Sequence, residues 1–217
     1  MVKSLIIRFL ILFIGGMFVG SSEGFASYIV PPGTTLLDRS SRTYMDVSEV
    51  TVLGWLEYLN WIKETKGENS DEFKAALPDS VICEKLYGAV RYFQHPKYRH
   101  YPIVGISYVQ AMNYCKWRTD RVNEKFKAGK VMYLLPDVYD FQAAFKKQKQ
   151  SKNISSSILP INPKKKTLSG IGYNVQEYTS NPNVILIGTE GDTLLFDDAT
   201  GASYLLGFRC KAIIIKE

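Results

Sequence analysis

The amino-acid sequence predicts an α+β fold, and three observations support this class. Apolar residues recur at three- and four-residue steps over 52–66 and 107–126, which is the spacing of amphipathic helices. Short runs rich in β-branched residues over 131–135, 184–188 and 193–196 are typical of strands. The chain has 217 residues, of which 46% are hydrophobic, so it is long enough for one domain with a real core.

Residues 1–26 have the pattern of a secretory signal peptide. A basic start, an apolar stretch and the small-x-small pattern Gly24-Phe25-Ala26 follow one another in the usual order. The uninterrupted apolar run, 9–20, is shorter than the about 20 residues that cross a bilayer, which favours a cleaved signal over an uncleaved membrane anchor. We therefore expect an exported protein with one domain over 27–217.

The net charge of +6 raises the question of a nucleic-acid partner. Much of the basic excess lies in 146–167, which is polar, serine-rich and contains two prolines. A charge run of this composition is usually a solvated surface, so we expect a flexible basic loop. The sequence therefore argues against a nucleic-acid partner.

Extended segments are expected at both ends of the domain. Residues 27–41 are rich in proline and glycine, and the alternation over 44–50 predicts a strand that ends near its last residue. The runs 184–188 and 193–196 are separated by Thr-Glu-Gly-Asp and predict a hairpin. Residues 211–215 are expected to form a terminal strand.

Three helices are predicted in the first half of the domain. Thr51 is a suitable N-cap for a helix over 52–66, and Gly67 is a suitable end. Shorter helices are expected over 72–77 and 80–87, each close to a proline or a polar cap.

The helix after Ser107 has the clearest start signal in the chain. Ser107 and Gln110 have the S-x-x-Q spacing of a capping box. We expect one apolar stripe made of Tyr108, Ala111, Met112, Cys115, Val122 and Phe126. A further helix is expected after the cap Asp137, with Val138, Phe141 and Phe145 on one face.

The stretch 102–118 also resembles a known family. It contains P-I-V-G-I-S-Y followed by A-x-x-Y-C-x-W-R, with Ser107, Trp117 and Arg118 at matched positions. This is similar to the "P-V-x-x-V-S-W … A-x-x-Y-C-x-W" signature of the formylglycine-generating enzymes, also called sulfatase-modifying factors. Tyr108 departs from the family's usual tryptophan.

Four further blocks resemble this family in the same order. Residues 44–51 are similar to its "F-x-M-D-x-x-E-V-T-N" block, and 134–141 to "R-L-P-T-E-A-E-W". Residues 170–180 contain the counterpart of "G-N-V-W-E-W-T-S", with Asn174 and Glu177 matched. The chain closes with G-F-R-C, in which Arg209 is matched. Matched residues such as Glu49 and Arg209 are expected to make internal ion pairs.

The resemblance implies an irregular formylglycine-generating-enzyme-like domain, related to C-type lectins, with two main helices and a small, mainly antiparallel sheet. The family enzymes oxidise a sulfatase cysteine with a pair of copper-binding cysteines upstream of G-F-R-C, and soft thiolates suit copper. This chain has no cysteine between Cys115 and Cys210, and Cys83 lies far upstream. We therefore expect no catalytic residues of the family type.

The resemblance further implies a disulfide between Cys115 and Cys210, because the family's cysteines at these positions pair. Such a bond would close a loop of about 95 residues and would stabilise the fold by several kcal/mol. The alternative is two reduced, buried cysteines that pack as small apolar residues.

A second implied feature is calcium, which family members bind around the G-N-V-W-E-W block. The candidate ligands are Glu177 and the backbone carbonyls of Tyr173 and Val175, whereas Gly170 replaces an upstream asparagine. A calcium ion takes six to eight oxygen ligands. The alternative is that Glu177 and Asn174 hold the turn by hydrogen bonds.

The sequence leads to a hypothesis of a non-catalytic, exported family member that acts as a binding or structural component of the periplasm or cell envelope. Its domain is similar to that of gliding-motility and type IX secretion proteins, so an envelope protein partner is expected. Membrane association is expected through that partner or through an uncleaved N-terminal segment. One alternative is a divergent sulfatase-modifying oxidase with Cys83 near its cleft. Another is a lectin-like glycan-binding module that uses Trp61 or Trp117 for stacking.

Overall fold

The computed structural model describes residues 30–87, 92–125, 130–148, 157–162, 164–199 and 202–215. The expected signal peptide, 1–26, lies outside these ranges, as do residues 149–156 and 163 of the basic segment 146–167. In the part of the chain that is described, no helix combines the length and the apolar character needed to cross a membrane.

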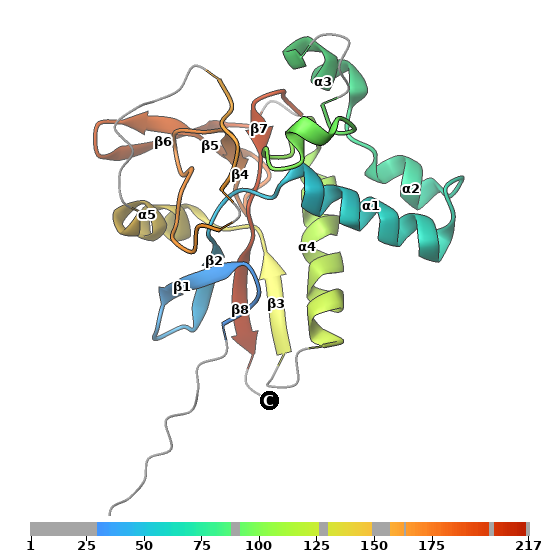
Figure 1. Cartoon of the computed structure of the whole chain (residues 1–217). Coiled ribbons are helices and arrows are strands. Elements are labelled where there is room, and N and C mark those ends of the chain that lie inside the picture. Colours follow the sequence, from blue (N-terminus) through green and yellow to red (C-terminus); the bar gives the residue numbers. More distant parts are fainter. Residues whose placement is uncertain are drawn as a thin grey trace, which may run out of the picture.

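The first and last strands of the described chain belong to the same antiparallel sheet (Figure 1). Its strand order is β1-β2-β8-β3. The strands are β1 (Thr34–Asp38), β2 (Thr43–Asp46), β8 (Lys211–Ile215) and β3 (Lys130–Leu134). Strand β8 pairs with both β2 and β3, so the last strand of the described chain lies inside the sheet rather than at its edge.

A second sheet has the order β6-β5-β4-β7. Its strands are β4 (Gln176–Tyr178), β5 (Val184–Glu190), β6 (Thr193–Asp198) and β7 (Leu206–Gly207). The predicted hairpin is confirmed, because β5 and β6 pair antiparallel around a turn that contains Gly191. Strands β4 and β7 pair in parallel. The fold is thus α+β, and the expectation of one small sheet was wrong, since the strands divide into two.

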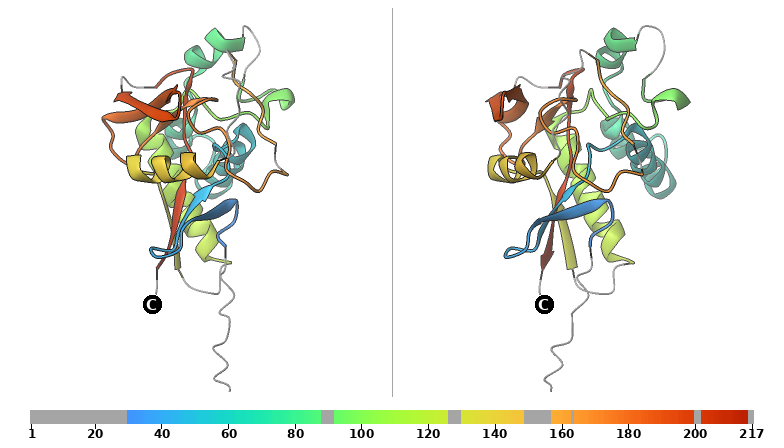
Figure 2. Two further views of the ribbon diagram at one scale, coloured as in Figure 1. Left: turned by 90° about the vertical axis from the view of Figure 1, so that its left-hand side faces the viewer. Right: turned by 60° about the vertical axis from the view of Figure 1, so that its left-hand side comes forward.

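The α-helices of the described chain begin and end close to where the sequence predicts. They are α1 (Val52–Lys66), α2 (Asp71–Ala76), α3 (Ser80–Tyr87), α4 (Tyr108–Asn123) and α5 (Val138–Lys147), with a short 3-10 turn, η1, over Pro96–Tyr98. Both parts of the predicted capping box form at Ser107, which accepts from the Gln110 N–H. Helices α4 and α5 lie on opposite sides of strand β8 (Figure 2).

An aromatic cluster fills the space between α1, α4 and the closing block of the chain. Trp55 is fully buried and stacks on Tyr114, with ring centroids 5.5 Å apart and planes at 12°. Phe208 meets both rings edge-on, at 6.1 Å and 5.4 Å. Aromatic pairs in such geometries add stability beyond their buried area. The cluster therefore joins two helices to the end of the chain.

Three local expectations differ from the structure. The strand expected to reach Val50 ends at Asp46. Val50 lies outside the sheet, and its N–H donates to the carbonyl of Phe208 at 2.8 Å. Met112 is 46% exposed, although it was placed in the apolar stripe of α4. The buried residues of α4 are Ala111, Tyr114 and Cys115. The basic loop expected to begin at residue 146 cannot begin before the end of α5, which continues to Lys147.

Candidate functional site

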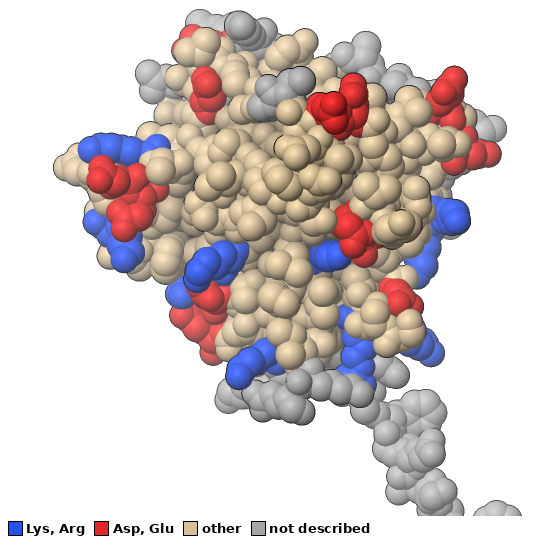
Figure 3. Space-filling model, turned by 180° about the vertical axis from the view of Figure 1, so that it is seen from behind, with Lys and Arg blue, Asp and Glu red and all other residues tan. Residues whose placement is uncertain are grey.

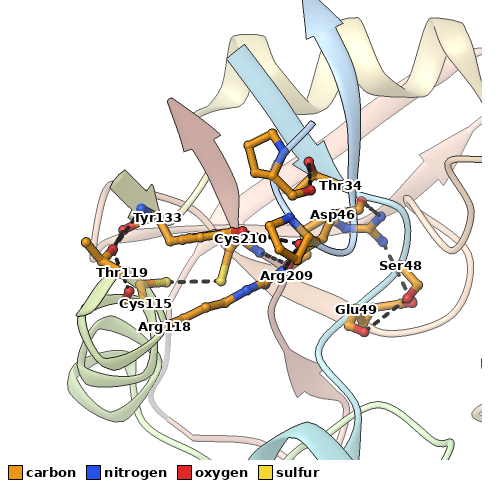
Figure 4. A network of polar contacts seen from close by, with 12 residues as sticks. Thr34, Asp46, Ser48, Glu49, Cys115, Arg118, Thr119, Tyr133, Arg209 and Cys210 are labelled. Carbon is orange, nitrogen blue, oxygen red and sulfur yellow. Dashed lines mark hydrogen bonds and ion pairs between the residues drawn. The ribbon is translucent and has the colours of Figure 1, made fainter. Parts of the chain in front are cut away.

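An ion pair joins α4 to β2 in the interior (Figure 4). The Arg118 guanidinium donates to both carboxylate oxygens of Asp46, at 2.7 Å and 2.9 Å. Asp46 Oδ2 also accepts the backbone N–H of Cys210 at 2.9 Å. The guanidinium lies over the ring of Tyr133, 4.2 Å from its centroid. One arginine thus ties together residues from four parts of the chain, in a bidentate geometry that favours arginine over lysine.

A second buried network surrounds Arg209. Its Nε donates to Glu177 Oε2 at 2.6 Å and its Nη2 to Glu177 Oε1 at 2.9 Å, and both side chains are fully buried. Nη1 donates to the Ser169 carbonyl at 3.0 Å. Glu49 Oε2 lies 3.8 Å from Arg209 Nη2, and Glu49 Oε1 has no hydrogen-bond partner among the described residues. We call Glu49, Glu177 and Arg209 the Arg209 network.

The Arg209 network places two carboxylates against one guanidinium. Burial raises the pKa of Glu177 to about 7, because the charged form loses its hydration. The Arg209 charge opposes this shift, and the negative charge of Glu49 adds to it. The pKa of Arg209 is raised by the two carboxylates, against the effect of its burial. The charged groups of the network are thus matched mainly by one another.

The expected calcium ligands do not form a coordination site in this arrangement. Both oxygens of Glu177 are engaged by Arg209, and the carboxylate is fully buried. No group of three or more His, Cys, Asp or Glu residues is placed to hold a metal ion in the described ranges. These residues therefore do not fit calcium, which would require Arg209 to leave the carboxylate.

Asn174 has a structural partner instead. Its Oδ1 accepts the Leu159 N–H at 2.8 Å, and its Nδ2 donates to Leu159 O at 3.3 Å. Tyr173 and Val175 line a separate surface cavity of about 350 Å³ beside the β4–β5 pair. The side chain of Asn174 thus holds the segment before it to this turn.

The two cysteines of the implied disulfide meet between α4 and the start of β8. Their sulfurs are 3.3 Å apart and both residues are buried (Figure 4). A disulfide bond is about 2.04 Å long, so this structure holds two thiols and the bond stays a prediction. Burial raises the pKa of the Cys210 thiol well above its ordinary value, which disfavours the reactive thiolate. Cys83 lies in α3, and its side chain is outside the described part.

In the described ranges, neither histidine belongs to a cluster of side chains that could hold a metal ion. His95 Nδ1 accepts the N–H of Lys97 at 3.1 Å and so caps the short turn η1. The backbone carbonyl of His100 accepts from the Ile161 N–H at 2.7 Å. Both residues therefore make structural contacts, His95 within its own turn and His100 through its backbone to a distant segment.

An open groove of about 480 Å³ lies between α1, α2 and α4. We call it the α1–α2–α4 groove. Its floor is aromatic, from Tyr58, Trp61 and Trp117, and polar side chains of α2 and α4 form its rim. Apolar concavities with a few polar groups are the usual form of ligand sites in proteins.

The aromatic rings of the floor pack against one another. The Trp117 ring centroid is 5.2 Å from those of both Tyr58 and Tyr114, with planes inclined by 47° and 52°. The Arg121 guanidinium lies 4.7 Å from the Trp61 ring centroid. The Trp117 Nε1 is buried and has no hydrogen-bond partner among the described residues. The rings of the floor therefore contact one another or a guanidinium, and the Trp117 Nε1 donor is buried rather than open to the groove.

Hydrogen bonds from two side chains hold the α2 wall of the groove. Gln110 Oε1 accepts the Ser107 N–H, and its Nε2 donates to the carbonyls of Ala75 and Leu77 at 2.8 Å each. Trp55 Nε1 donates to Ala76 O at 3.1 Å. These carbonyls end a six-residue helix and would otherwise lack partners. The capping-box glutamine thus also fixes the groove.

The charges of the rim are unevenly matched. Lys116 Nζ pairs with Asp120 at 3.0 Å, one turn along α4. Asp71 and Glu72, in the first turn of α2, are exposed and make no ion pair with a described residue. Lys66 is the other exposed cation of the rim. Three carboxylates and two ammonium groups therefore give the rim a net negative charge.

Sequence reasoning found part of this arrangement. Trp61 and Trp117 were identified as candidate ligand contacts, and both line the groove. The role of α2 was missed, since nothing within its sequence indicates that its carbonyls meet Gln110. No protein-family model matches the chain, and no curated protein matches it. The family resemblance of the five sequence blocks stays a prediction.

Proposed function

We propose that this chain is a non-catalytic, exported binding module with a formylglycine-generating-enzyme-like domain, and that it serves as a binding or structural component of the cell envelope. The observation that carries this proposal is the α1–α2–α4 groove, whose aromatic floor is open and whose α2 wall is held by Gln110 and Trp55. A wall that is already ordered lowers the entropic cost of binding.

The buried residues of the family-like blocks support a binding role over a catalytic one. Arg118 is engaged by Asp46, and Arg209 by Glu177, through bidentate ion pairs. Groups held in this way stabilise the arrangement of the blocks, and their donor and acceptor atoms are already engaged within the protein. The sequence also has no cysteine between Cys115 and Cys210 to serve as the family's catalytic thiols.

The partner proposed for the groove is another envelope protein, of the kind found in gliding-motility or type IX secretion assemblies. Association with the membrane would then follow from that partner or from an uncleaved N-terminal segment. This context comes from the family resemblance and from the predicted signal peptide.

Glycan binding is the second candidate function, because two tryptophans line the groove. A sugar-stacking platform needs a flat, uncovered aromatic face. Trp117 contacts Tyr58 and Tyr114, which also contact each other, and Trp61 has a guanidinium close to its ring. The contacts of the floor therefore favour a ligand that inserts side chains over one that stacks sugar rings.

The test is photo-crosslinking in living cells from two exposed positions. A photoreactive amino acid replaces Asn113, which lines the groove, or Tyr139, which is 80% exposed on α5. We expect a discrete protein adduct from position 113 and none from position 139. Identical adducts from both positions, or no protein adduct from position 113, would contradict the proposed function.

A further inference from the structure

Exposed apolar side chains continue the α1–α2–α4 groove along α4. Val109 is 65% exposed and Met112 is 46% exposed, and Leu77, at the end of α2, is 39% exposed. The Leu77 carbonyl accepts from Gln110 on α4, so the two helices meet at this point. We call Leu77, Val109 and Met112 the apolar strip.

The apolar strip and the groove rim share one face of α4. Val109, Met112, Asn113 and Lys116 follow the spacing i, i+3, i+4, i+7, which places them on the same side of a helix. Asn113 and Lys116 line the groove. The strip and the groove are therefore parts of one continuous surface.

The view from behind, where α4 is on the near side, shows how charge is distributed on this side of the molecule (Figure 3). Charged side chains gather toward the edges, and a broad area in the middle carries none. The tan atoms include uncharged polar residues, so the apolar part of this surface is given by the exposed Leu77, Val109 and Met112. Large exposed apolar patches on soluble proteins often mark interaction sites. Methionine is common on surfaces that accept peptides, because its side chain is flexible and polarisable.

We propose, on the basis of the binding function above, that the occupant is an extended segment of a partner protein with a defined chemistry. One large apolar side chain of the segment enters the groove, and its neighbours cover the apolar strip. A lysine or arginine of the same segment lies opposite Asp71 and Glu72.

Charge complementarity identifies the basic residue of this segment. Asp71 and Glu72 are unpaired among the described residues, whereas Lys116 is already matched by Asp120. A cation beside an aromatic ring gains further attraction from the ring electrons. The contact of the Arg121 guanidinium with Trp61 of the groove floor, 4.7 Å from the ring centroid, is an example within this protein.

The extent of the surface favours a protein segment over a sugar or a small molecule. The groove holds about 480 Å³, but the strip lies beyond it and offers only apolar contacts. A sugar has few apolar groups to cover such a strip. An extended peptide presents side chains at regular intervals and can reach both parts.

The test is selection of random peptides displayed on phage by the chain purified in its exported form. We expect enriched peptides that combine a large apolar residue with lysine or arginine. The variant Ala75→Trp fills the groove from an exposed position of α2. It should weaken the binding of a synthetic consensus peptide by about tenfold or more. Lys74→Trp is the matched control, since it is exposed on the same helix but does not line the groove.

Charge reversal provides a second, surface-located test. In the double variant Asp71→Lys, Glu72→Lys the selection should enrich acidic peptides with the same apolar residue. Enrichment of peptides without a cation by the native chain, unchanged selection after charge reversal, or equal binding by Ala75→Trp would each overturn the proposal. So would an absence of enriched peptides, or glycan binding that Ala75→Trp abolishes.

The two proposals fail in different experiments. If the peptide selection fails while the adduct from position 113 is obtained, the binding function stands and the extended, basic segment is wrong. If position 113 gives no protein adduct, the binding function itself is contradicted. Thermal melting of each variant verifies that it is folded before its binding is measured.

Discussion

The Arg209 network and the α1–α2–α4 groove contain similar carboxylate groups in opposite settings. In the network, Glu49 and Glu177 are buried beside one guanidinium, and their environment is entirely protein. In the groove, Asp71 and Glu72 are exposed and unpaired within the described chain. The comparison teaches that Glu49 and Glu177 are enclosed within the fold, whereas Asp71 and Glu72 are available to a ligand.

The cost of removing a charge differs between the two regions. A buried ion pair that loses one partner leaves an uncompensated charge in a medium of low polarity, whereas an exposed ion pair is screened by water. The following predictions separate the regions, beginning with the largest expected effect.

Replacing Arg209 should destabilise the protein most. Arg209→Met leaves the carboxylates of Glu49 and Glu177 buried without a cation, and we expect the free energy of unfolding to fall by about 3 to 5 kcal/mol. Arg121→Met is the control, because its partner Glu124 is half exposed, and it should cost less than about 1 kcal/mol. Denaturant unfolding measures both. Equal losses of unfolding free energy in the two variants would contradict the expected contribution of the Arg209 network to stability.

The pH dependence of stability should reveal the raised pKa of Glu177. Its pKa is raised from 4.5 to about 7 in the folded protein, so the folded state binds one more proton than the unfolded state between these values. Stability from this group is therefore complete below about pH 4.5 and falls as pH rises to about 7, at up to ~1.4 kcal/mol per pH unit.

The measurement is the difference in unfolding free energy between the native chain and Glu177→Gln across this pH range. The amide cannot titrate, so this difference isolates the proton of Glu177 from the other carboxylates. We expect the native chain to lose stability relative to the variant as pH rises. A relative gain over the same range would mean that the ion pair with Arg209 outweighs the burial of the carboxylate.

Gly170 tests how closely the chain approaches Glu49. A Cβ at this position would lie 2.3 Å from Glu49 Oε1, and the backbone φ is +88°. Gly191 also has a positive φ, of +58°, but a Cβ there would meet nothing within 4 Å. We expect Gly170→Ala to cost about 2 to 3 kcal/mol and Gly191→Ala about 1 kcal/mol, by thermal or chemical unfolding. Similar costs would argue against close packing at Glu49.

Neutralising the groove carboxylates should have the smallest effect on stability. Asp71→Asn with Glu72→Gln removes only a favourable interaction with the start of α2, worth less than about 1 kcal/mol. The same double variant should reduce the yield of protein adduct from position 113 in cells. A large loss of stability with unchanged adduct yield would assign these carboxylates to the fold.

Local signals in the sequence predicted the helix starts and the hairpin well. Ser107 with Gln110, Thr51, and the Thr-Glu-Gly-Asp turn each act within a few residues, so their chemistry is visible without the fold. Met112 was misplaced for the opposite reason. Apolar character predicts burial only where another element covers the side chain, and in the described structure Met112 stays 46% exposed.

What the sequence by itself determined is the α+β class, the helices with their caps, and the charge and thiol inventory of the chain, because these depend on composition and on neighbours within one turn. Only the tertiary structure decided the partners. Arg118 meets Asp46 from 72 positions away, and Arg209 meets Glu177 from 32. Gln110 reaches the carbonyls of α2 from more than 30 positions away. Such contacts arise when the core closes, since burial brings distant polar groups together and requires each to find a partner.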